Sequence, residues 1–286
     1  MIKAYYELAK PGIIYGNAIT AVGAYFLAAR GHGNIGTFLA MLLGISLVIG
    51  SACVCNNFLD RDIDKKMQRT KKRALVTHAI SGPQSLLFAA VLGILGLLLL
   101  GVYNNFLTAT VALFGFLMYV AVYTPIKRLS VYGTLVGSIS GAVPPIVGYC
   151  AATNCLDLGA GILFLILVFW QMPHFYAIAM YRLHDYTEAN IPVLPIVSGM
   201  RVTKIHIVSY IAALLVAVIG LTLTHFAGYT VAIVLVGITV FWLLKGIKGL
   251  TSSSIQDATW ARGMFFFSLI VILVLCGMLS LNSFLI

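Results

Sequence analysis

The stretch GTFLAMLLGISLVIGSACVC (residues 36–55) runs directly into NNFLDRDIDKKMQRTKKRAL (residues 56–75). The first part is mostly apolar and, as a helix, is long enough to cross a hydrocarbon core about 30 Å thick. The second part carries three aspartates and seven Lys or Arg residues. This junction predicts a transmembrane helix that ends in a charged loop at the membrane surface.

Apolar segments of similar length recur along the whole chain. Of its 286 residues, 61% are hydrophobic and only 9% are charged, whereas a soluble domain has about 25% charged residues. This composition predicts an all-α integral membrane protein with nine transmembrane helices in one domain, residues 1–286. Pro125 is expected to end the fourth helix. The expected spans are residues 12–30, 36–55, 84–102, 105–123, 132–150, 159–180, 205–225, 228–245 and 264–284.

The basic residues are distributed unequally between the two ends of these spans. Seventeen of the 18 Lys and Arg residues fall on one side, and only Arg30 falls on the other. Because loops rich in Lys and Arg stay in the cytoplasm, this asymmetry predicts a cytoplasmic N-terminus and an outer C-terminus. The net charge of +10 is therefore mainly a topology signal. Basic groups that flank membrane spans in this way argue against binding to nucleic acid.

Acidic residues gather on the same side, where membrane topology does not require them. Asn56, Asp60 and Asp64 are spaced i, i+4, i+8. On a continued helix they form one stripe, and Asp62 lies on the opposite face. Amide and carboxylate oxygens in this arrangement suit Mg²⁺, which commonly shares its coordination shell with substrate phosphates. Neighbouring Lys and Arg side chains can pair with the remaining phosphate oxygens.

The charged loop has two other interpretations. The pattern D-x-D-x-D also opens a calcium-binding EF-hand loop, but that loop needs Gly at its sixth position and Glu at its twelfth. Lys65 and Lys71 stand there, which excludes an EF-hand. A solvated loop that only fixes topology explains the basic residues. It does not explain why an amide and two carboxylates share one helical face, although it stays open on these residues alone.

The fifth span carries a periodic pattern of small residues. Gly133, Gly137 and Gly141 repeat every four residues. Such a stripe lets helices approach each other closely in lipid. It predicts tight packing of this span against a neighbour, and Pro144 and Pro145 are expected to bend its outer half.

The motif N-x-x-x-D-x-x-x-D in NNFLDRDID, followed by RTKKRAL, resembles the first motif of the UbiA superfamily of intramembrane prenyltransferases. YTPIKR is similar to the superfamily's Y-x-x-x-K motif. VYGTLVGSISGAVPPIVGYCA, WQMPHFYAIAMYRLHDY and ANIPVLPIV resemble its haem O synthase branch. The likeness covers about residues 7–265. It implies a single nine-helix bundle around a central cavity that binds a prenyl diphosphate through Mg²⁺.

The resemblance also implies roles for particular residues. The superfamily's second motif is D-x-x-x-D; this chain has Asp185, but Ala189 stands four residues later, and Glu188 is the nearest further acid. The implied metal ligands are Asn56, Asp60, Asp64 and Asp185. The implied catalytic set adds Tyr123 and Lys127, and the diphosphate ligands are Arg69, Lys72, Arg73, Lys127 and Arg128. An aromatic belt residue beside a snorkelling lysine is the alternative for Tyr123 and Lys127.

His174 is the most informative histidine. It follows Pro173 within the sixth span, and ionisable residues inside a membrane usually face a cavity or the bundle interior. Trp170 lies one helical turn earlier on the same face. The resemblance implies that both contact haem, whose iron an imidazole can ligate. A histidine bonded to a backbone carbonyl freed near the proline is the alternative.

The implied reaction transfers farnesyl from farnesyl diphosphate to a vinyl group of protohaem IX (haem b), with addition of water, giving haem O for haem–copper oxidase biogenesis. The implied setting is a prokaryotic inner membrane, among lipid, with the active site towards the cytoplasm and association with haem A synthase or a terminal oxidase. The alternatives are a related prenyltransferase with a quinone-precursor aromatic acceptor, a secondary transporter, and a non-catalytic haem-binding subunit. A transporter predicts ionisable residues near the bilayer midplane, whereas nearly all acids here lie at one membrane face.

Overall fold

The computed structural model describes residues 1–251 and 256–285, and over this part of the chain it is built from helices without strands. Nine helical stretches in that part are long and apolar enough to cross a membrane. They are α2 (Pro11–Ala29), α3 (Ile35–Leu59), α5 (Gly82–Leu99) with η1 (Leu100–Asn104), α6 (Phe106–Leu117) with η2 (Met118–Tyr123) and α7 (Thr124–Leu129), α8 (Gly133–Gly141) with α9 (Val143–Thr153), α10 (Leu158–Tyr181), α13 (Gly199–Leu223), α14 (Tyr229–Leu250) and α15 (Asp257–Leu285). The shorter helices are α1 (Ile2–Leu8), α4 (Arg61–Asp64), α11 (Leu183–Glu188) and α12 (Leu194–Val197).

The predicted nine spans are confirmed over the described residues, with the largest differences at the end of the fourth span and at the starts of α13 and α15. Both helices begin several residues before the apolar segment. Lys204 of α13 and Asp257 of α15 pair at 2.5 Å, with side chains only 5% and 8% exposed. This buried ion pair lets the polar first turns of α13 and α15 form helix inside the bundle. Hydropathy alone does not detect such turns, because they are not apolar.

The expectation that Pro125 ends the fourth span is wrong. The helix widens into the π-helical segment η2, and then continues through α7 to Leu129. At the change of register both the Thr124 amide and its hydroxyl reach the carbonyl of Tyr119, the hydroxyl at 2.9 Å. Pro125 then occupies the first turn of α7, where a missing N–H is tolerated.

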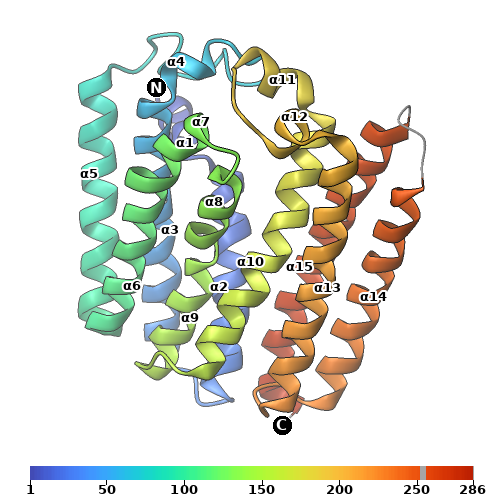
Figure 1. Ribbon diagram of the computed structural model, residues 1–286. Coiled ribbons are helices and arrows are strands. Elements are labelled where there is room, and N and C mark those ends of the chain that lie inside the picture. Colours follow the sequence, from blue (N-terminus) through green and yellow to red (C-terminus); the bar gives the residue numbers. More distant parts are fainter. Residues whose placement is uncertain (252–255, 286) are drawn as a thin grey trace.

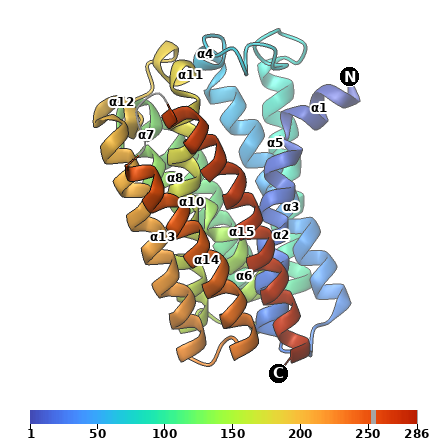
Figure 2. The same ribbon diagram turned by 90° about the vertical axis from the view of Figure 1, so that its right-hand side faces the viewer.

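The helices form one bundle in which the first and last transmembrane helices, α2 and α15, pack side by side. Helix α2 packs against α3, α9 and α15, and α10 packs against α8, α13 and α15. The short helices α4, α7, α11 and α12 gather at the end of the bundle that holds the N-terminus, while α15 ends at the opposite end (Figures 1 and 2). The two acidic segments, α4 and α11, therefore lie at the same mouth of the bundle.

Candidate active site

A cavity of about 840 Å³ opens between these helices. Its lining comes from most of the bundle, including α2, α3, α8, α10, α11 and α15. Charged groups and apolar groups both contribute to it. The predicted site residues that line it are Asn56, Asp60, Asp64, Arg69, Arg73, Tyr123, Lys127, Trp170, His174 and Asp185.

The first acidic motif forms the predicted stripe. Helix α3 ends at Leu59, but the amide of Asp60 donates to the carbonyl of Asn56 at 2.8 Å, and the amide of Asp64 donates to the carbonyl of Asp60 at 2.9 Å. The helical register therefore continues across the junction into α4. Asn56, Asp60 and Asp64 are 2–4% exposed, whereas the Asp62 side chain is 62% exposed on the opposite face.

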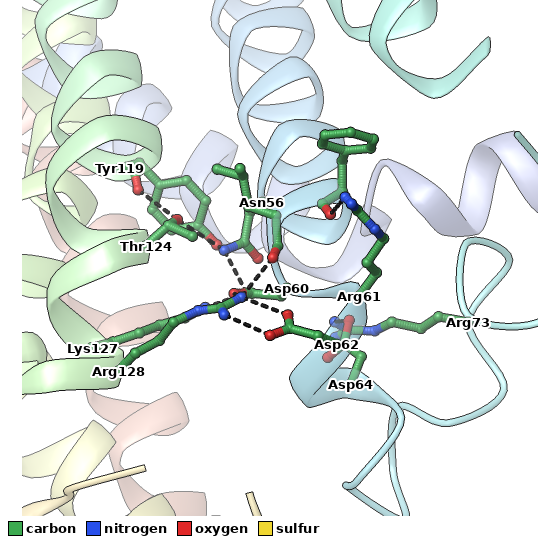
Figure 3. A network of polar contacts seen from close by, with 12 residues as sticks. Asn56, Asp60, Arg61, Asp62, Asp64, Arg73, Tyr119, Thr124, Lys127 and Arg128 are labelled. Atoms are coloured by element: carbon green, nitrogen blue, oxygen red, sulfur yellow. Dashed lines mark hydrogen bonds and ion pairs between the residues drawn. The ribbon is translucent and has the colours of Figure 1, made fainter. Parts of the chain in front are cut away.

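Each oxygen-bearing side chain of the stripe faces a cation (Figure 3). Lys127 pairs with Asp60, and Arg73 pairs with Asp64 at 2.6 Å. The Asn56 amide nitrogen donates to Asp60 at 2.8 Å, which leaves its carbonyl oxygen free to accept from a cation. A buried amide oxygen and two buried carboxylates that already face positive charge fit a hard divalent cation, which takes oxygen ligands of this kind.

Lys10 completes this network, although its position in the sequence is equally compatible with simple anchoring at the membrane surface. Its ammonium donates to the Asn56 carbonyl oxygen at 2.7 Å. The residue precedes Pro11 and adopts a left-handed backbone conformation with φ of 54°. Its side chain lines the cavity. Burial lowers the pKa of Lys10 to about 8. A non-glycine residue in this conformation is costly, and Lys10 places a cation within the cavity.

The second acidic segment contributes one carboxylate. Asp185 of α11 is 8% exposed and lines the cavity. Its carboxylate has no ion-pair or hydrogen-bond partner among the described residues. Glu188 does not line the cavity, and its carboxylate lies 3.4 Å from His184. Ala189 packs among apolar residues around Met67 and does not line the cavity.

The glycine stripe of α8 brings three functional side chains into place. A Cβ atom on Gly133 would lie 2.6 Å from the Cα of Lys127, and one on Gly137 would lie 2.8 Å from the ring of Tyr123. A Cβ on Gly141 would lie 2.1 Å from the side-chain oxygen of Gln171. Helix α8 therefore presses directly against residues that line the cavity. The predicted tight packing has a specific purpose here, since it positions Lys127, Tyr123 and Gln171.

Aromatic residues form another part of the cavity wall. The Trp170 and His174 rings stack with centroids 5.0 Å apart, and Phe265 lies 5.0 Å from His174. The indole of Trp170 donates to the carbonyl of Ser268 at 2.9 Å, and the Nδ1 atom of His174 lies 2.7 Å from the Ser268 hydroxyl. Helix α15 therefore holds both rings through Ser268.

Two of the predicted diphosphate ligands lie outside this cavity. Lys72 is exposed in the loop after α4. Arg128 points outward, where it pairs with Asp62 at 2.8 Å and reaches Asp60 at 3.2 Å. The Arg128 hydrogen bond lowers the pKa of Asp62. Arg182, at the end of α10, lines the cavity instead. It was not assigned from the sequence, because a single arginine at a helix end is an ordinary topology signal.

Fold and site together define an integral, multi-pass membrane protein with a partly charged, partly aromatic cavity. A model of the UbiA prenyltransferase family matches residues 17–270. The chain therefore belongs to the UbiA prenyltransferase family.

Relatives and solved structures agree with this assignment. The chain is 51% identical to a protoheme IX farnesyltransferase of Yersinia pseudotuberculosis and 50% identical to one of Sodalis glossinidius, each over 99% of this chain and 95% of the relative. Its fold is similar to a digeranylgeranylglyceryl phosphate synthase structure, with a TM-score of 0.82 at 16% identity over 100% of this chain and 99% of that one. It is also similar to a UbiA homolog from Archaeoglobus fulgidus bound to GPP and Mg²⁺, with a TM-score of 0.68 at 13% identity over 97% and 99% of the two chains.

Proposed function

We propose that this chain transfers the farnesyl group of farnesyl diphosphate to a vinyl group of protohaem IX, with addition of water, and so makes haem O. The observation that carries the proposal is 51% identity over nearly the whole length to relatives named protoheme IX farnesyltransferase. The cavity supports it, because acids and cations lie at one mouth and stacked aromatic rings line another part of the wall.

The charged mouth is where we place the diphosphate. Asn56, Asp60, Asp64 and Asp185 would hold Mg²⁺, which would neutralise charge that builds on the leaving group as the C1–O bond breaks. Such groups accelerate the reaction only if they bind the transition state more tightly than the ground state. The cations that line the cavity are suited to that role, because they stand beside the carboxylates. They are Lys10, Arg69, Arg73, Lys127 and Arg182.

The apolar and aromatic walls would bind the prenyl tail and the macrocycle. Trp170 offers a flat surface for the porphyrin, and His174 stands beside it. Helix packing around the cavity would keep bulk water away from the allylic cation until the new carbon–carbon bond has formed.

The orientation of the bundle follows from the charge asymmetry of its loops. We place the acidic mouth at the cytoplasmic face of a prokaryotic inner membrane, because nearly all Lys and Arg residues lie at that end. Association with haem A synthase or a terminal oxidase remains a further proposal, and co-purification from membranes containing both tests it.

The deciding experiment is direct. Purified protein in detergent is incubated with haem b, farnesyl diphosphate and Mg²⁺, and the pigment is examined by mass spectrometry. We expect a mass gain equal to one farnesyl group plus one water. A parallel incubation contains 4-hydroxybenzoate instead of haem b. Prenylation of 4-hydroxybenzoate without prenylation of haem b would overturn the proposal in favour of a quinone-precursor acceptor.

A further inference from the structure

Gln171 carries an amide that the protein itself does not satisfy. The residue is 4% exposed and lines the cavity. Its Nε2 atom is buried without a hydrogen-bond partner among the described residues. Gly141 leaves just enough space for the amide to stand against α8. A buried, unpaired amide is costly unless a water or a ligand completes its hydrogen bonds.

The neighbouring His174 is held in one tautomer. The Ser268 hydroxyl donates its single proton to the carbonyl of Phe265 at 2.6 Å. Since that hydroxyl lies 2.7 Å from Nδ1 of His174, it can only accept a hydrogen bond from the ring. The proton of the neutral imidazole therefore resides on Nδ1. The other nitrogen, Nε2, keeps a free lone pair, and His174 lines the cavity.

Gln171 and His174 are three residues apart on α10. Side chains with this spacing are neighbours on one helical face, with Cβ atoms about 5–6 Å apart. Both line the same cavity. A water molecule between the two side chains could accept from the amide and donate to the imidazole nitrogen. That water would be bound by the amide and would have an unprotonated nitrogen beside it.

We propose that Gln171 and His174 bind the water that adds to the prenylated haem, with His174 as the base and Ser268 as a positioning residue that keeps Nε2 unprotonated. The inference rests on the proposed function. In that reaction the C1–O bond of farnesyl diphosphate breaks and its electron pair leaves with the diphosphate. The terminal vinyl carbon bonds to C1, which places positive charge on the vinyl carbon next to the porphyrin ring.

The water completes the reaction at that charged carbon. Its oxygen bonds to the carbon through a lone pair, and one of its protons passes to Nε2 of His174. Haem b, farnesyl diphosphate and one water thus give haem O, diphosphate and one proton. The competing fate of the same cation is loss of a proton from carbon, which gives a prenylated haem lighter by one water.

The partition between these two products tests the proposal. Purified variants are incubated with haem b, farnesyl diphosphate and Mg²⁺, and the ratio of hydrated to water-free prenylated haem is measured by mass spectrometry. This ratio is taken among product molecules only, so changes in haem affinity or in protein yield do not alter it. Isotope-labelled water confirms the source of the added oxygen.

Three substitutions remove separate parts of the site. Gln171→Met keeps the length of the side chain but removes the amide. His174→Asn keeps a donor near Ser268 and removes Nε2. Ser268→Ala removes the hydroxyl that fixes the tautomer of His174, whereas Ser268→Thr keeps a hydroxyl at that position. We expect the ratio to fall about tenfold or more in the first three variants and to return with Ser268→Thr.

Ser280→Ala is the matched control. Ser280 lies on the same helix as Ser268 and donates to a backbone carbonyl four residues earlier at 2.9 Å, but it does not line the cavity. We expect its product ratio to equal that of the unchanged protein. A ratio that stays unchanged in both Gln171→Met and His174→Asn would overturn the proposal.

Other outcomes are equally decisive. If His174→Asn alters the absorption spectrum of bound haem while the product ratio stays the same, the histidine ligates iron and is not the base. If Gln171→Met or His174→Asn gives no product, the difference between Ser268→Ala and Ser268→Thr decides, and equal ratios in these two variants count against the proposal. If the unchanged protein forms no prenylated haem, it is the proposed function that fails.

Discussion

Replacing Asp64 with asparagine tests the charged mouth of the cavity most directly. The side chain is 5% exposed and accepts from Arg73 at 2.6 Å. Asparagine keeps the shape but loses the charge that a divalent cation and Arg73 both require. The substitution therefore separates the electrostatic role of this residue from its packing.

The expected magnitudes follow from the surroundings of this pair. Breaking a fully buried ion pair costs roughly 3–5 kcal/mol. Because a quarter of the Arg73 side chain contacts solvent, we expect a smaller loss of stability, about 2 kcal/mol. A metal contributes several kcal/mol to a transition state of this kind. Loss of one charged ligand out of the proposed set should cost about 2.7 kcal/mol, which is about a hundredfold in rate.

Asp62→Asn is the matched control, since Asp62 lies in the same turn. Its side chain is 62% exposed, and its ion pair with Arg128 at 2.8 Å is a surface interaction worth about 0–1 kcal/mol. We expect turnover within about twofold of the unchanged protein. The assay measures haem O formation against Mg²⁺ concentration for both variants. Equal turnover in Asp62→Asn and Asp64→Asn would refute the metal site.

Three further predictions concern packing, the acceptor and the metal. Gly148→Ala should lower the stability in detergent by about 1–3 kcal/mol, because the added Cβ would lie 2.1 Å from the carbonyl oxygen of Ala21. Gly161→Ala is the control, since its Cβ would meet nothing within 4 Å. Equal thermal unfolding temperatures of the two variants would contradict the packing argument. His174→Ala should raise the KM for haem b more than the KM for farnesyl diphosphate, because the ring belongs to the aromatic wall. Steady-state kinetics that show equal changes in the two KM values would argue against haem binding at that wall. Chelation of divalent metal should lower turnover at least about a hundredfold, with recovery on adding Mg²⁺; turnover that survives chelation would exclude metal assistance.

The features predicted correctly from the sequence are local ones. Hydropathy gives the nine spans because each must be apolar over a length that crosses the hydrocarbon core. The stripe of Asn56, Asp60 and Asp64 follows from helical periodicity, and the backbone bonds across the junction preserve it. Burial of all three, with Asp62 exposed, is the outcome that periodicity predicts.

The features that the sequence did not reveal depend on contacts between distant segments. Lys10 reaches Asn56 across 46 residues, and only its left-handed backbone conformation turns it towards the cavity. Tyr119 and Thr124 carry the helix past Pro125 through a π-helical turn, which proline statistics do not anticipate. No periodicity distinguishes Arg182, which lines the cavity, from Lys72, which does not.

The charge within the cavity explains why metal and diphosphate belong together. Among the described residues that line it, five cationic side chains accompany three carboxylates. Without substrate, Lys127 and Arg73 pair with Asp60 and Asp64. In the proposed reaction a bound diphosphate would attract those cations away from the two buried carboxylates. The carboxylates would then repel each other unless another cation replaced the lost ones. A divalent metal does so and is attracted by the same anion, so each ligand favours binding of the other. Arg128 lies outside the cavity and bridges Asp60, at 3.2 Å, to the exposed Asp62, at 2.8 Å.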